Sequence, residues 1–213
     1  MLEILQSIAS GIPLSIALTI VAFVSGAVLG MPLCGMRASN AQPVRVLSGA
    51  LVLTLRSIPP IVWLFFIFFG LGADFIQISP FEAAALGLGL ITAANMAEIY
   101  RGALTAIHPG QWEAAAALNL PPLYRFVDVI GPQLFRIALP SGATYAIGLL
   151  KDTAIASTIG VPEIAFEAYH TSQRTFHSLD VYAVAGLFYI LISLSLAALT
   201  RWADVKLRAR VAR

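Results

Sequence analysis

Two pairs of polar side chains interrupt long apolar stretches of the sequence and are the residues best placed to bind a charged solute. Lys151 and Asp152 are adjacent within one apolar stretch, and Asn95 and Glu98 are three residues apart within another. Ionisable groups at the depth of a bilayer are costly unless they are paired or hydrated, so they commonly mark a functional site. In a helix Asn95 and Glu98 share one face, whereas Lys151 and Asp152 point about 100° apart. We therefore expect that the helix breaks at Lys151–Asp152, or that each of the two finds a partner on another helix.

The same residues also fit a purely structural interpretation. A buried ion pair, either Glu98–Lys151 or Arg101–Asp152, would hold two helices together without contacting any solute. The two interpretations differ in what a substitution does. Loss of a structural partner impairs assembly, whereas loss of a residue that contacts solute leaves assembly intact and alters the response to solute.

The composition indicates that these stretches cross a membrane. The chain has 213 residues, of which 59% are apolar and 11% charged, and its mean hydropathy is +0.85. Soluble domains are about 45–50% apolar and about 25% charged, so this chain has too few charges to cover a soluble surface. Its one cysteine, Cys34, excludes an internal disulfide and lies in an apolar stretch, where a buried thiol is expected.

We predict an all-α polytopic membrane protein with five transmembrane helices and one domain. The predicted spans are residues 12–36, 46–71, 81–103, 141–159 and 181–200, and residues 72–82 form a connector between the second and third. Arg56 and the pair Pro59–Pro60 lie in the first half of the second span. Either the prolines kink a membrane helix, or the membrane portion begins near Ser57 and Arg56 reaches the interface.

Five spans divide the loops and termini between the two faces of the membrane, and the basic residues are distributed very unequally between these faces. One face carries only Arg174. The other side carries Arg37, Arg45, Arg56, Arg101, Arg125, Arg136 and the five basic residues of the tail, Arg201, Lys206, Arg208, Arg210 and Arg213. Cytoplasmic loops are enriched in Lys and Arg, so we expect the amino end outside and the carboxyl end in the cytoplasm.

A polar-edged elbow spans about residues 111–140 and falls on the predicted cytoplasmic side. Residues 112–118 predict a short helix with Glu113 in its first turn, where negative charge suits the helix dipole. Asn119 is suited to a left-handed stop, and Pro122 can open a second short helix that carries Arg125. The elbow is therefore predicted as a helix–turn–helix with one apolar face, and an amphipathic helix lying on the membrane surface is the alternative.

Signals for chemistry on this chain are weak. The sequence has no glycine-rich phosphate loop followed by Lys-Ser/Thr, so we expect no ATP hydrolysis here. His170 and His177 are seven residues apart, which is poor spacing for a metal site, and we expect no metal, catalytic residue, cofactor or nucleic-acid partner. A membrane scaffold or a membrane-embedded enzyme remains the alternative function.

The elbow resembles the loop that defines the type-1 permease subunits of ABC transporters, the ATP-driven importers of the binding-cassette class. Glu113-Ala114-Ala115 match the family's Glu-Ala-Ala. Asn119 stands at the family's glycine, Val129 at its isoleucine, Gly131 at its leucine and Pro132 at its proline, so the glycine and the leucine are departures. Further stretches are similar to the branch that carries polar amino acids, namely residues 97–102, 109–115, 136–140, 150–153 and 159–163. The resemblance covers residues 11–203.

This resemblance implies a non-catalytic permease subunit in a bacterial cytoplasmic (inner) membrane. Its implied partners are a second, like or identical permease, two ATP-binding-cassette ATPases and an external solute-binding protein. ATP and Mg would be bound by the ATPases rather than by this chain. The residues implied to couple the elbow to an ATPase are Glu113, Ala114, Ala115, Asn119 and Arg125.

The resemblance also implies a substrate class, namely polar amino acids of the histidine, glutamine or arginine type, or derivatives such as opines. A zwitterionic amino acid needs one positive and one negative contact. Asn95, Glu98, Lys151 and Asp152 could supply both from a hydrated cavity, which makes them the predicted lining of the substrate path.

Overall fold

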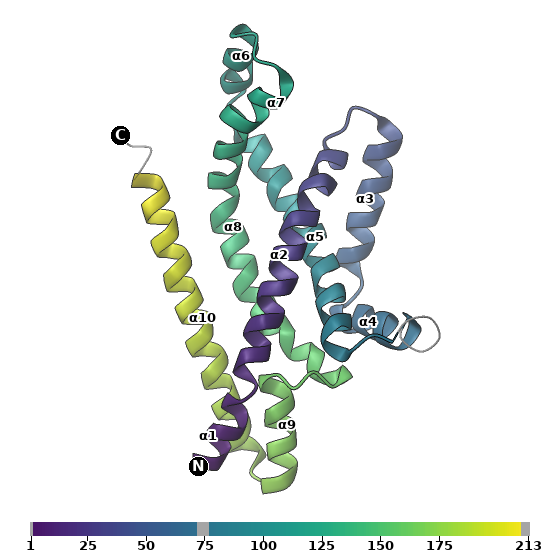
Figure 1. Ribbon diagram of the computed structural model, residues 1–213, viewed down its shortest axis with the longest axis vertical. Helices are drawn as coiled ribbons and strands as arrows, with labels where there is room; N and C mark the ends of the chain where they lie inside the picture. Colours follow the sequence, from purple (N-terminus) through teal and green to yellow (C-terminus); the bar gives the residue numbers. More distant parts are fainter. Residues whose placement is uncertain (1, 72–76, 210–213) are drawn as a thin grey trace.

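The computed structural model describes residues 2–71 and 77–209, and within these ranges every regular element is helical (Figure 1). The all-α prediction is therefore confirmed, although part of the predicted 72–82 connector lies outside the described residues. The elements are α1 (Leu2–Ala9), α2 (Ile12–Arg37), α3 (Gln42–Ser57), α4 (Pro60–Phe65), η1 (Phe66–Leu71), α5 (Pro80–Ala106), α6 (Pro109–Ala117), α7 (Pro122–Tyr124), η2 (Arg125–Ile130), α8 (Gly131–Asp152), η3 (Thr153–Ile159), α9 (Ile164–Thr175) and α10 (Ser178–Ala209).

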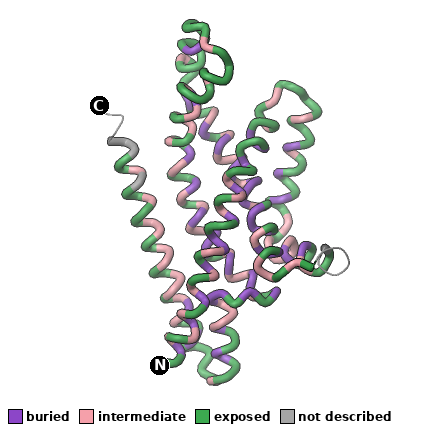
Figure 2. Tube along the Cα trace, in the orientation of Figure 1, coloured by how far each residue is buried: buried purple, intermediate pink, exposed green. Residues whose placement is uncertain are grey.

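The centre of the fold is the close pair formed by α2 and α5. A Cβ atom built on Gly26 of α2 would lie 2.4 Å from the Thr92 Cβ of α5, and one built on Gly89 would lie 2.9 Å from the Ser25 Oγ. Only glycine permits this approach of the two backbones, as small residues do generally between membrane helices. Figure 2 shows the buried residues concentrated along α2, α5 and α8, whereas the elbow and most of α10 are exposed.

Three helical stretches are long and apolar enough to cross a membrane: Leu2–Arg37, Pro80–Ala106 and Ser178–Lys206. A fourth span exists if Gln42–Ser57 and Pro60–Gly70 are counted together, because this pair is bent by 100°. The helix is thus broken at the double proline, and both interpretations of this segment, a kinked span and a membrane portion that begins near Ser57, stay open. Among the described helices α8 does not meet the same criterion of length and hydropathy, so the count of five spans stays a prediction.

The predicted boundaries of the fourth span are wrong. A span over residues 141–159 was expected, but α8 begins at Gly131, runs through Pro140 and ends at Asp152. The chain then tightens into the 3₁₀ helix η3 and turns at Gly160, whose φ is +92°. The helix therefore ends at Lys151–Asp152, which is one of the two outcomes expected for that pair.

The elbow and the opposite end of the molecule are built from different segments. The elbow, the α2–α3 connection and the carboxyl end of α10 lie towards one end in Figure 1, and α1 and α9 lie at the other. At that second end Ile4 and Ile8 of α1 pack against Ile164 and Ala168 of α9 and Val181 of α10. The short amino-terminal segment is thus a docked helix of the fold.

Candidate functional site

The first half of the elbow is closed by a left-handed residue, as predicted. Helix α6 ends at Ala117, and Asn119 has a φ of +53°. The Asn119 N–H donates to the Ala116 carbonyl at 2.9 Å, and the Leu120 N–H donates to the Ala115 carbonyl at 3.3 Å. These two bonds form a Schellman motif, which satisfies the last carbonyl groups of the helix. Asn119 therefore does at this turn what glycine does in the family pattern.

The second half of the elbow is not a separate short helix, and that prediction is wrong. After Pro122 the helix continues through the π-helical segment η2 directly into α8. The Gly131 N–H bonds back to the Phe126 carbonyl, and a Cβ on Gly131 would lie 2.9 Å from that oxygen. Glycine in place of the family's leucine accommodates this wider turn.

The residues predicted to couple the elbow divide into exposed and internal groups. Glu113 and Ala114 are exposed, while Ala115 is only 2% exposed and lies on the side where α6 packs on η2. Arg125 does not project outward, because one guanidinium nitrogen donates to the Leu120 carbonyl at 3.3 Å and its Nε is buried. Arg125 thus stabilises the turn itself, and Glu113 and Asp128 are exposed charged residues of the elbow.

Large apolar side chains on the elbow are exposed beside Glu113. Leu118 is 74% exposed and Leu123 69% exposed, and Tyr124, Phe126 and Val127 are also exposed. Across the base of the elbow, the Gln133 side chain donates to the Gln111 side chain at 3.0 Å and joins α6 to α8. The elbow is a braced unit whose uncovered apolar surface can fit into a cleft of another protein.

Glu98 is engaged by two guanidinium groups. Arg37 of α2 donates from Nε to one carboxylate oxygen at 3.2 Å, and Arg101 donates to the other oxygen at 2.7 Å. The Arg37 guanidinium also lies close to Gly49 of α3, where a Cβ would come within 2.7 Å of it. This cluster therefore ties α2 to α5 and lies against α3.

A second polar cluster surrounds Tyr145 on α8. Its hydroxyl lies 3.2 Å from the Thr92 hydroxyl of α5. The Arg56 Nε of α3 donates to the Asn95 side-chain oxygen at 3.1 Å. Because Thr92 and Asn95 are three residues apart, a phenol of α8 and a guanidinium of α3 meet α5 on one helical face.

The four predicted path residues do not form one group within this chain. Asn95 lies on the face of α5 that meets Tyr145, Asp152 ends α8 seven residues beyond Tyr145, Glu98 belongs to the arginine cluster and Lys151 is exposed. Because Thr92 meets Tyr145 between antiparallel helices, Glu98 lies six residues towards the elbow and Lys151 six residues away from it. At 1.5 Å per residue their levels differ by roughly 18 Å.

Neither of the two structural ion pairs considered from the sequence is formed among the described residues. Sequence reasoning also missed Tyr145, although it lies seven residues before Asp152 and therefore on the same helical face. That spacing was the available signal.

Glu163, at the end of the stretch 159–163 that resembles the family, is fully buried where α2, α9 and α10 meet. Its carboxylate accepts the Tyr189 hydroxyl at 2.6 Å, the Ser15 hydroxyl at 3.2 Å and the Phe166 N–H at 2.9 Å, and so caps α9. Burial raises the pKa of Glu163, against the lowering effect of these hydrogen bonds. The site holds three helices together at the end opposite the elbow.

The chain belongs to the family of binding-protein-dependent transport system inner membrane components, whose sequence model matches residues 26–209. It is a permease subunit of an ABC importer, a non-catalytic membrane component that works with a separate ATPase and a binding protein.

Individual relatives support the same family. The chain is 37% identical to the arginine ABC transporter permease protein ArtQ of Haemophilus influenzae, over 67% of this chain and 68% of that one. It is 30% identical to the probable amino-acid ABC transporter permease protein y4tG of Sinorhizobium fredii, over 98% of this chain and 90% of that one. A solved structure of an amino acid ABC transporter with histidines has a TM-score of 0.88 at 27% identity, over 97% of this chain and 96% of that one.

Proposed function

We propose that this chain is the permease subunit of an importer of polar amino acids or their close derivatives. The observation that carries the proposal is the braced elbow, with its outward Glu113 and uncovered apolar side chains, on a chain whose relatives are named for arginine and amino acids. The elbow would insert into a cleft of the partner ATPase. Because η2 runs unbroken into α8, closure of the ATPase pair would move α8 as a rigid lever.

The proposed orientation places the elbow in the cytoplasm and the amino end outside. It is supported by the distribution of charge: Arg37, Arg45 and Arg125 lie towards the elbow end, and Arg174 of α9 lies at the opposite end (Figure 1). Enrichment of basic residues on the cytoplasmic side favours this direction. The proposal retains five membrane crossings, with α8 as the fourth.

The proposed assembly contains two permease subunits, two ATPases and one external solute-binding protein. One chain of this size leaves the outer face of α3 and the Lys151 end of α8 exposed, so a path through the membrane needs a second subunit to enclose it. ATP and Mg belong to the ATPases, and no cofactor is assigned to this chain.

The proposed substrate contacts lie in and beyond the Tyr145 cluster. Arg56, whose Nε donates to the Asn95 side chain, would bind a carboxylate. Asp152, seven residues further from the elbow than Tyr145, would attract a positively charged group at a different level of the path. Lys151, exposed at the end of α8, would face the path formed with the second subunit. Glu98 is assigned to the arginine cluster that links α2 and α5, in place of its predicted role in the path.

The proposal is tested by ATP hydrolysis of the purified assembly with a panel of ligand-loaded binding proteins. We expect stimulation by one polar amino acid or derivative and little by apolar ones. Asp152→Asn should assemble normally and lose or change this preference, while Glu167→Gln, on α9 outside the predicted spans, should not. Stimulation that is indifferent to the amino acid, or an unchanged preference in Asp152→Asn, would refute the assignment.

A further inference from the structure

Two neighbouring hollows between α8 and α10 form one continuous groove on the exposed side of the molecule. The first, of about 380 Å³, is lined by α2, α5, α8 and α10, and the second, of about 240 Å³, by α8 and α10 alone. Both are lined by Leu139, Ala143 and Thr200. We call their union the α8/α10 groove, lined by Leu139, Ala143 and Thr144 of α8 and by Leu196, Thr200 and Arg201 of α10.

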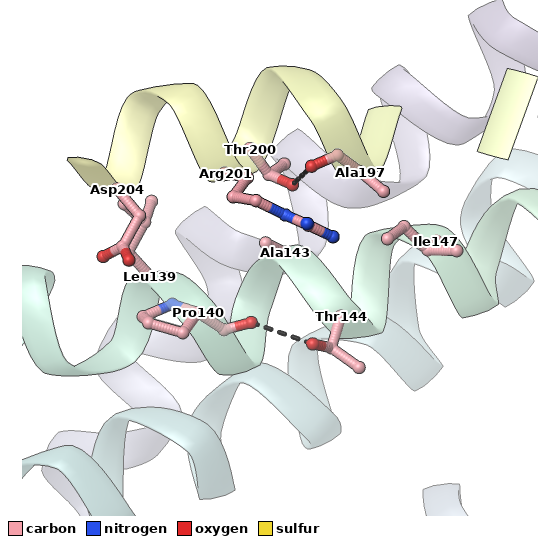
Figure 3. A pocket seen from close by; sticks show the side chains of 9 residues that line it. All are labelled: Leu139, Pro140, Ala143, Thr144, Ile147, Ala197, Thr200, Arg201 and Asp204. Atoms are coloured by element: carbon pink, nitrogen blue, oxygen red, sulfur yellow. Dashed lines mark hydrogen bonds between the residues drawn. The ribbon is translucent and has the colours of Figure 1, made fainter. Parts of the chain in front are cut away.

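The two hollows of the groove differ in polarity. Its larger part is lined by aliphatic and aromatic side chains with few polar atoms, and Arg201 lines the smaller part. Figure 3 shows the Arg201 side chain extending from α10 across the groove, over Ala143 and towards Ile147. A guanidinium group in such surroundings is costly without an anionic partner.

Arg201 is the polar group in the groove that is left to bind a ligand. The Thr144 hydroxyl donates to the Pro140 carbonyl and the Thr200 hydroxyl to the Ala197 carbonyl, each at 3.0 Å, so both are satisfied within their own helices. Asp204 already interacts within the protein. For the part of the chain that the structure describes, no hydrogen bond or ion pair is found for the Arg201 guanidinium.

We propose that the α8/α10 groove binds an anionic phospholipid, with its phosphate at Arg201 and one acyl chain in the apolar part. Arginine presents paired donors that match phosphate oxygens. The surrounding segment is strongly basic, because residues 201–213 contain five Lys or Arg residues and one acidic residue, Asp204. Such segments beside a membrane helix attract anionic lipids.

The position of the groove along α10 also suits a lipid headgroup. Trp202 follows Arg201, and the Lys206 ammonium lies 3.8 Å from the centre of the Trp202 ring. Tryptophan with a neighbouring cation is typical of the level where hydrocarbon meets headgroups. These neighbours favour a position of Arg201 near the membrane surface, where the phosphate of a lipid can reach it.

A helix of a second copy of this chain fits the groove less well, because it would have to bring a free carboxylate to Arg201. At the depth of the helices, Glu98 is held by two arginines and Asp152 lies at the far end of α8 from the elbow. Glu113 and Asp128 belong to the elbow, and Glu163 is buried in its own cluster. A lipid phosphate supplies the missing charge directly.

The first test measures lipid binding to the full permease, purified with its partner ATPase, by native mass spectrometry with phosphatidylglycerol or phosphatidylcholine. We expect retention of phosphatidylglycerol in preference to phosphatidylcholine. Arg201→Gln should weaken phosphatidylglycerol binding about tenfold, as loss of one charge-assisted pair implies. Lys206→Gln is the matched control with the same charge change outside the groove, and it should weaken binding much less. Equal losses in the two variants would overturn the proposal, because they would indicate only general attraction to the basic tail.

The second test identifies the occupant directly by placing a photo-crosslinking residue at Ala143. Attachment of a single phospholipid mass supports the proposal. Attachment of another protein chain, or retention of phosphatidylglycerol at wild-type level when Ala143→Leu fills the groove, overturns it. The thermal midpoint of Ala143→Leu in lipid-free detergent shows that the variant is folded.

Discussion

The Nε of Arg37 and a carboxylate oxygen of Glu98 lie 3.2 Å apart although the two residues are separated by 61 positions in the chain. The other oxygen of Glu98 is bound by Arg101 at 2.7 Å, so one carboxylate compensates two cations at the α2–α5 junction. Both ends of the Arg37–Glu98 pair are partly shielded, with side chains 24% and 18% exposed. The pair is therefore expected to contribute to stability more than a surface pair does.

Glu98→Gln should lower the free energy of unfolding by about 1–2 kcal/mol, because two guanidinium groups lose their charged partner in a partly shielded site. The measurement is the thermal midpoint of the purified assembly in detergent, with Glu3→Gln as the exposed control. The amino-acid preference of the assembly should not change. A normal midpoint together with an altered preference would return Glu98 to the substrate path.

Asn119 should tolerate glycine and reject a β-branched residue. Asn119→Gly is expected to be near neutral, since glycine adopts positive φ without strain, whereas Asn119→Val should cost about 1–2 kcal/mol. Co-purification of the ATPase and the thermal midpoint measure the two effects. If valine is tolerated as well as glycine is, the left-handed turn is not important for the elbow.

The orientation predicts which residues an impermeant thiol reagent reaches. In a background where Cys34 is replaced by alanine, a cysteine at Glu167 should react from outside intact cells, and one at Ala38 should react only after permeabilisation. Both native positions are at least partly accessible in the structure. The reverse labelling pattern would place the elbow outside and remove it from contact with an ATPase.

Glu163 should make stability depend on pH. Because burial raises its pKa in the folded protein, the folded state binds the proton more tightly than the unfolded state does. The contribution of Glu163 to stability therefore falls as pH rises from its unfolded pKa of about 4.3 through its folded value. Glu163→Gln should flatten this part of the profile of thermal midpoint against pH, and the neighbouring Glu167→Gln should not. An unchanged slope in Glu163→Gln would mean that another group titrates there.

Features governed by neighbouring residues were the ones that the sequence predicted well. The stop at Asn119 follows from local backbone chemistry, whereas the break at the double proline and the helix end at Asp152 were each one of two expected outcomes. The start of α8 was mispredicted because Pro140 suggested the end of the elbow. Pro132 instead lies in the first turn of α8, where a missing N–H is tolerated, and Pro140 is accommodated within the helix.

Features that depend on helix register could not be predicted. Glu98 seemed a partner for Lys151 because both interrupt apolar stretches, but the antiparallel contact of Thr92 with Tyr145 sets them at different levels. Glu163 falls between the predicted fourth and fifth spans. It is buried because Gly11 lets the backbones meet, since a Cβ there would lie 2.5 Å from the Glu163 carbonyl carbon.

The decisive measurement is substrate-stimulated ATP hydrolysis and uptake by the assembly reconstituted in proteoliposomes with Glu113→Lys. The exposed position of Glu113 on the braced elbow predicts normal insertion of this variant but loss of stimulated hydrolysis and of uptake. Glu167→Lys, at the opposite end of the molecule, is the matched charge reversal and should retain both activities. A Glu113→Lys assembly that co-purifies with its ATPase and transports at the wild-type rate would contradict the coupling role of the elbow.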